Sequence, residues 1–79
     1  MICRVVVVKR NGILDPEGQT IKAALNGKGY KFIDDVRVGK IYDIKVPDDE
    51  DIKPEIEELS RKILSNSLVE DFKIEYIES

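Results

Sequence analysis

The alternation of apolar and polar positions along the chain predicts six secondary-structure elements. Apolar residues at every second position, bounded by turn residues, predict strands over 2–9, 31–38, 41–46 and 72–77. Apolar residues three or four positions apart predict helices over 15–27 and 52–65. In the predicted strands after the first, one face is apolar and the other mostly polar. This pattern is typical of a sheet that helices cover on one side.

The predicted order β-α-β-β-α-β favours an α+β fold. We expect a two-layer sandwich in which both helices lie on one face of a four-stranded antiparallel sheet, ferredoxin-like by analogy. The 79 residues form a single predicted domain, 1–79. This length is close to the lower limit at which one core supports a fold without metals, disulfides or a partner, so oligomerisation is expected to help.

The first predicted strand contains four consecutive valines. Val5 and Val7 lie on one face of this strand, and Val6 and Val8 lie on the other. Whichever face the helices cover, valine remains on the outer face. We interpret this as a candidate self-association strand and expect a dimer or tetramer; cover by neighbouring Lys and Tyr side chains within the monomer is the alternative.

A strand-turn-helix junction follows the valines. Gly12 predicts a tight turn, Asp15 a helix N-cap, and Pro16 the first helical residue, where the missing N–H costs nothing. Gly18 does not fit this pattern, because glycine in the first turns of a helix costs up to about 1 kcal/mol relative to alanine. Close approach of another backbone and a loose helix start both explain it, and the sequence does not separate them.

The composition of the chain argues against several classes of function. The net charge of -3 argues against nucleic acid as a partner, because phosphate binding needs concentrated Lys and Arg. The chain has no histidine that could activate a thiol as a nucleophile. Its single cysteine, Cys3, is therefore expected to pack as a small hydrophobic residue. No apolar run is long enough to span a membrane and no signal-peptide pattern is present, so we expect a soluble cytoplasmic protein.

Two short motifs have simple structural interpretations. The glycines of Asn26-Gly27-Lys28-Gly29 close a predicted helix instead of opening one, which favours a C-cap over a phosphate loop. The acidic run Asp48 to Asp51 lacks the ligand spacing of a calcium loop and is expected to complement the positive end of the following helix. We therefore predict no catalytic, cofactor-binding or metal-binding residues.

Three segments of the chain carry a resemblance to a known family. They are Gly12-Ile13-Leu14-Asp15-Pro16-Glu17-Gly18-Gln19 after the valine strand, Val36-Arg37-Val38-Gly39-Lys40, and Asn66-Ser67-Leu68-Val69-Glu70-Asp71-Phe72-Lys73-Ile74-Glu75. In this order and spacing the chain resembles the PurS family. That family is the small subunit of phosphoribosylformylglycinamidine synthase, an enzyme of purine biosynthesis.

The resemblance implies a non-catalytic assembly subunit. In such a complex a glutaminase subunit releases ammonia. A large synthetase subunit uses ATP to convert formylglycinamide ribonucleotide to the amidine, and the small subunit bridges the two and assists ammonia transfer. ATP and Mg are then expected on the large subunit, with no cofactor on this chain.

Consecutive elements of a sandwich alternate in direction. The connections at 10–15, 37–40 and 66–71 should therefore emerge at one end, which we interpret as the candidate partner-docking end. Its candidate residues are Gly12, Asp15, Gly18, Arg37, Lys40, Glu70 and Asp71. A small-molecule-binding regulatory α+β module, such as an amino-acid-binding domain with this element order, is the alternative function.

Overall fold

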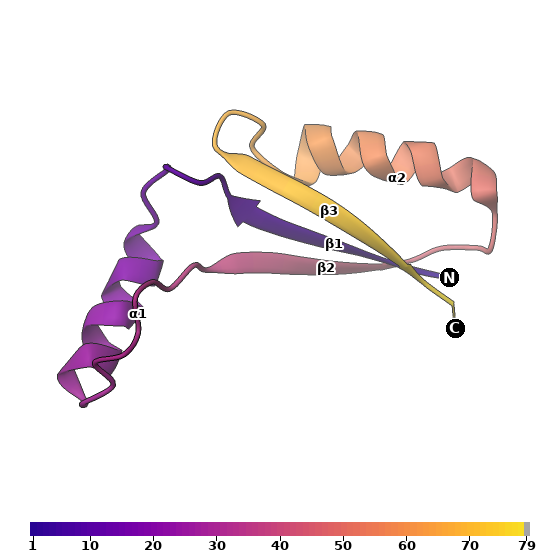
Figure 1. Cartoon of the computed structure of the whole chain (residues 1–79). Helices are drawn as coiled ribbons and strands as arrows, with labels where there is room; N and C mark the ends of the chain where they lie inside the picture. The colour runs from indigo at the N-terminus through magenta and orange to yellow at the C-terminus, as the bar shows by residue number, and fades with distance from the viewer. Residues whose placement is uncertain (79) are drawn as a thin grey trace.

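A computed structural model of the chain, which describes residues 1–78, contains a three-stranded antiparallel sheet and two principal helices (Figure 1). The elements are β1 (Ile2–Lys9), α1 (Pro16–Gly27), β2 (Gly39–Lys45), α2 (Lys53–Leu59) and β3 (Glu70–Ile77). A short 3-10 turn, η1 (Glu50–Ile52), precedes α2, and a π-helical turn, η2 (Ser60–Leu64), follows it. The strand order is β2-β1-β3, so the valine strand lies in the centre.

The expected four-stranded sheet is wrong, although the α+β class holds. Within residues 1–78 the segment 31–38 is not a strand, and β2 begins only at Gly39. Its alternating apolar residues predicted a strand, but its backbone contacts the start of α1 instead. The N–H of Val38 donates to the side chain of Asp15, and the carbonyl of Val36 lies against Gly18 in α1. These groups are engaged with the start of α1 and pair with no neighbouring strand.

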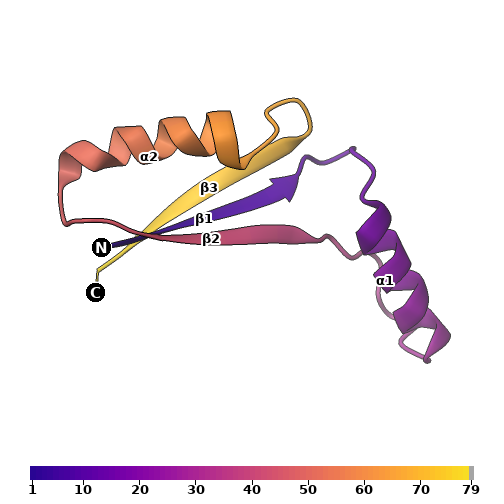
Figure 2. The ribbon, with the colours of Figure 1, turned by 180° about the vertical axis from the view of Figure 1, so that it is seen from behind.

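The two helices do not share a face of the sheet, which corrects the second part of the expected fold. α2 lies along one face, whereas α1 projects beyond the end of the sheet as an arm (Figures 1 and 2). Residues 28–35 run back beside α1 and form part of this arm, and residues 36–38 lead from it into β2. The radius of gyration is 15.9 Å, compared with about 12 Å for a compact domain of this length. The molecule is therefore extended, and Ile21 of α1 is exposed.

The core is small and lies between α2 and the inner face of the sheet. It consists of Cys3, Val5 and Val7 from β1 and Ile56 from α2, all nearly fully buried. Aromatic and aliphatic residues of β2 and β3 flank it on the same face, because residues directly opposite in an antiparallel pair lie on one side. The expectation that Cys3 packs as a small hydrophobic residue is confirmed.

The second predicted helix is present, but a π turn changes its last part. The N–H of Ser65 donates to the carbonyl of Ser60 five residues earlier, at 3.0 Å. This extra residue per turn rotates the helix face, so Leu64 packs against the core while Ile63 is 78% exposed. A regular α-helix would place Ile63 on the same face as Ile52, Ile56 and Leu59.

The outer face of the sheet carries the second pair of valines, as the alternation predicted. Val6 is partly buried and Val8 is exposed, and Ile41 on β2 lies directly opposite Val6 with 64% exposure. Charged residues share this face, including the bidentate pair of Arg4 with Asp43 at 2.8 and 3.1 Å. The outer face is thus a mixed apolar and charged surface. No helix in the described part of the chain is long and apolar enough to cross a membrane.

Candidate docking end of the sheet

The three connections that were expected to meet at one end do meet there. The strand register pairs Val8 with Gly39 and Lys9 with Glu70, so the end of β1 lies beside the starts of β2 and β3. A backbone bond of 2.9 Å from the N–H of Arg10 to the carbonyl of Val69 joins two of the connections. The loss of one predicted strand does not change this, because β2 and β3 both run antiparallel to β1 and therefore both start where β1 ends.

Asp15 is the buried centre of this end. It is 4% exposed, and its carboxylate accepts two backbone hydrogen bonds. Oδ1 accepts from Gly18 at 3.0 Å, which is the predicted N-cap, and Oδ2 accepts from Val38 at 2.7 Å. The Val38 bond above all, then the Gly18 bond, lowers the pKa of Asp15; burial opposes the shift, and the nearby cations Arg37 and Lys9 add to it.

The structure settles the role of Gly18. A Cβ at this position would lie 2.1 Å from the carbonyl oxygen of Val36, so close approach of another backbone is the explanation that holds. Gly39 is similar, since its Cβ would lie 2.6 Å from the carbonyl oxygen of Val7. Both glycines let the segment that leads into β2 pass closely beside α1 and β1.

Arg37 holds the backbone of the β1–α1 connection. Its guanidinium donates to the carbonyl oxygens of Lys9 at 3.0 Å, Arg10 at 2.9 Å and Ile13 at 3.2 Å. Gly12, with φ of +87°, makes the turn that brings these carbonyls together, and the N–H of Ile13 closes the turn on the carbonyl of Arg10. The sequence indicated a charge at this end but gave no sign that Arg37 binds three carbonyls.

The other candidate charged residues differ in whether a partner within the chain already binds their side chains. Glu70 is partly buried and its Oε1 accepts from the N–H of Asn66 at 2.7 Å, and Asp71 pairs with Arg10 at 3.0 Å. Lys40 is exposed and makes no ion pair within residues 1–78. Of the candidate charged residues, Lys40 is therefore the one most available to a partner.

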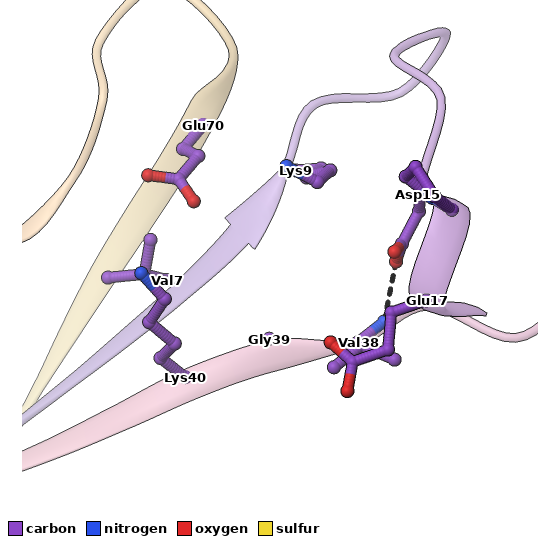
Figure 3. A pocket seen from close by; sticks show the side chains of 9 residues that line it. Val7, Lys9, Asp15, Glu17, Val38, Gly39, Lys40 and Glu70 are labelled. Atoms are coloured by element: carbon purple, nitrogen blue, oxygen red, sulfur yellow. Dashed lines mark hydrogen bonds between the residues drawn. The ribbon is translucent and has the colours of Figure 1, made fainter.

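A hollow of about 510 Å³ lies between the start of α1 and the ends of the strands. Figure 3 shows its lining, with Lys9, Lys40, Glu17 and Glu70 around it and the Asp15–Val38 hydrogen bond on one side. Side chains of both signs of charge line the hollow together with the apolar residues Val7, Pro16 and Val38. Such a surface suits a polar protein segment better than an anion, because the carboxylates offset the lysines.

The predicted C-cap in Asn26-Gly27-Lys28-Gly29 is confirmed, and the acidic run lies at η1, directly before α2. Gly29, two residues after the end of α1, has a φ of +100°. The N–H groups of Gly29 and Tyr30 donate to the carbonyls of Asn26 and Leu25, respectively, which is a Schellman closure. In the acidic run, Asp49 caps η1 by accepting from the N–H of Asp51 at 2.9 Å. In the described residues no group of His, Cys, Asp or Glu side chains is arranged to hold a metal ion.

The known proteins that this chain resembles in sequence and in structure include several PurS proteins. A curated PurS subunit of phosphoribosylformylglycinamidine synthase from Methanocaldococcus jannaschii is 37% identical over 72 residues, covering 89% of this chain and 87% of the relative. A crystal structure of Bacillus subtilis PurS superposes with a TM-score of 0.88 at 29% identity, covering 98% of both chains. A solved M. jannaschii PurS, described as one of the subunits of formylglycinamide ribonucleotide amidotransferase in the purine biosynthetic pathway, gives 0.81 at 36% identity, again covering 98% of both.

The family model described as PurS, phosphoribosylformylglycinamidine (FGAM) synthase, matches residues 2–78. This range includes the three segments that carried the resemblance and all five strands and helices described above. The agreement covers both the sequence and the three-stranded fold with its projecting helix. The chain therefore belongs to the PurS family of FGAM synthase.

Proposed function

We propose that this chain is the small, non-catalytic subunit of FGAM synthase in purine biosynthesis, acting in the cytoplasm. In this role it bridges the glutaminase subunit and the large synthetase subunit, so that ammonia passes between them. ATP and Mg act on the large subunit. The match of residues 2–78 to the PurS family carries this proposal.

The shape of the chain supports an assembly role. The radius of gyration of 15.9 Å belongs to an extended molecule with an arm that does not pack on its own sheet. Large apolar side chains remain exposed, among them Leu14, Phe32 and Leu68. A chain that leaves this much apolar surface uncovered is suited to burying it against other subunits or a second copy.

Reconstitution with the two larger subunits tests the proposal. Glutamine-dependent synthesis of the amidine should require this chain, whereas synthesis from added ammonium salt should depend on it less. The isolated chain should show no glutaminase, ATPase or synthetase activity. Glutamine-dependent turnover by the two larger subunits alone, unchanged when this chain is added, would contradict the bridging role.

The docking end is tested by reversing one accessible charge. Lys40→Glu should weaken assembly with the larger subunits, because an exposed lysine desolvated against a partner becomes a buried repulsion when reversed. Lys45→Glu is the matched control, since Lys45 is exposed on the same strand at its opposite end. Equal binding by both variants and the native chain in co-purification would show that the docking surface lies elsewhere.

A further inference from the structure

The arm formed by α1 and residues 28–35 is joined to the sheet by two short crossings. Residues 10–15 lead outward from β1, and residues 36–38 lead back into β2 (Figures 1 and 2). A 12-residue helix that packs on no sheet has little stability of its own. Because α1 lies on no face of the sheet, its angle to the sheet must be set at these two crossings.

Each crossing is bound by a side chain of the other. Arg37, on the returning crossing, donates to the carbonyls of Lys9, Arg10 and Ile13, on or just before the outgoing one. Asp15, at the end of the outgoing crossing, accepts from the N–H of Val38 on the returning one. The bonds run in both directions and involve charged groups, which makes them stronger than neutral hydrogen bonds.

Close packing accompanies these bonds. At Gly18 the first turn of α1 lies so near the carbonyl oxygen of Val36 that no side chain fits between them. The carboxylate of Asp15 caps the same turn through the N–H of Gly18. One residue, Asp15, thus ties together the start of α1 and the return to β2.

We propose that Arg37 is a positioning residue that, together with Asp15, locks the joint of the arm and presents α1 at a fixed angle to the sheet. The planar fork of a guanidinium reaches several carbonyls at once, which the single ammonium of lysine does not. A fixed arm loses less conformational entropy when it packs against a second copy or another subunit, so the locked joint should favour assembly. This consequence rests on the proposed function. The locked joint itself is a property of the single chain.

The test measures the arm directly. Spin labels are placed at exposed positions on α1 and β3 through Ala23→Cys and Lys73→Cys, in a Cys3→Ala background and diluted with unlabelled chain, so that only the distance within one chain is read. The native joint should give one narrow distance distribution. Arg37→Gln should broaden or shift it, and Arg37→Lys should fail to restore it. The Val38 amide stays bonded to Asp15 in these variants, so its exchange reports how often the joint opens. Its exchange should accelerate by roughly two- to tenfold, because the joint has lost the hydrogen bonds of Arg37.

Arg10→Gln is the matched control. Arg10 lies on the same connection and its side chain pairs with Asp71, so the variant removes an equal charge without unlinking the two crossings. Its distance distribution should stay narrow. If Arg37→Gln does not fold by circular dichroism, the result for Arg37→Lys decides.

A narrow, unshifted distribution in the folded Arg37 variant overturns the proposal. Sedimentation of the unlabelled chains, which keep Lys73 opposite Val6 on the outer face, is a separate readout of self-association. A native chain that remains monomeric would contradict the self-association step of the proposed function, and the distance distribution would still decide the joint.

Discussion

A methyl group on Gly18 would lie 2.1 Å from the carbonyl oxygen of Val36, which is closer than any real contact of this kind. Gly18→Ala should therefore push α1 away from the returning chain and lower the free energy of unfolding by about 1 to 3 kcal/mol, the usual cost of overpacking. Urea unfolding at a fixed protein concentration measures the loss. Gly27→Ala is the matched control, because a Cβ there meets nothing within 4 Å and alanine is the better helix former. Equal effects of the two variants would show that the contact with Val36 does not constrain the joint.

The small core makes Ile56 decisive for the stability of the sheet. Ile56 is 3% exposed and connects α2 to Cys3, Val5 and Val7. Ile56→Ala should lower the free energy of unfolding by about 2 to 5 kcal/mol, through lost burial and the cavity it leaves. Ile63→Ala removes the same atoms from the same helical segment, where the π turn exposes them, and should cost far less. Comparable losses in the two variants would mean that Ile63 is not exposed in solution.

The carboxylate of Asp15 should make the stability of the protein depend on pH. Its folded pKa lies below its ordinary value because the backbone N–H groups of Val38 and Gly18 bind the charged form. Its stabilising contribution is present above the unfolded pKa of about 3.9 and is lost as the pH falls below that value through the folded pKa. Asp43, whose pKa is also lowered by its hydrogen bond from Arg4, adds a contribution of the same sign.

Asp15→Asn removes the titrating charge and keeps only one of the two acceptor oxygens, so one of the bonds from Gly18 and Val38 is lost with the charge. The pH dependence, rather than the stability at one pH, therefore reports the titration of the carboxylate. The variant should be less stable than the native chain at pH 7, and its urea midpoint should fall less between pH 5 and about pH 3. Asp34→Asn, an exposed carboxyl in the same arm, serves as the control. A native acid-side slope that Asp15→Asn leaves unchanged would argue against a charged Asp15 at the joint.

Several features of the fold could be predicted from the sequence, because local chemistry determines them. The limits of β1, the cap at Asp15 and the closure at Gly29 follow from strand patterning, side-chain acceptors and positive φ. The segment 31–38 could not be predicted in this way. Its alternating Phe32, Val36 and Val38 match a strand, but a strand needs a free neighbouring edge, and the carboxylate of Asp15 takes the Val38 N–H.

The candidate docking end was predictable as a place but not in its details. Alternation of direction brings its three connections together whatever the strand order. Which charges are free depends on side-chain partners many residues away: Arg37 binds the carbonyls of Lys9 and Arg10, more than 25 residues earlier, while Lys40 stays exposed. A variant that reversed Arg37 as well as Lys40 would therefore disturb the joint as well as the surface, and Lys40 alone is the better probe.

The outer face of the sheet provides the last prediction, which concerns self-association. Val8 and Ile41 are exposed there on adjacent strands, and α2 covers only the opposite face. We expect the chain to form a dimer or tetramer that buries this face, because a 79-residue chain with so small a core gains stability from covering further apolar surface. Sedimentation or light scattering over a range of concentrations measures the mass.

Val8→Lys combined with Ile41→Lys should shift the assembly toward monomer, since two lysines on the contact face repel their copies and must be desolvated. Ile63→Lys is the control, because Ile63 is equally apolar and 78% exposed but belongs to η2 on the opposite side of the sheet. Circular dichroism should show that all variants keep the fold. A native chain that stays at 9.0 kDa at every concentration would refute self-association. An assembly lost with Ile63→Lys and kept with the double variant would place the contact on the helical side.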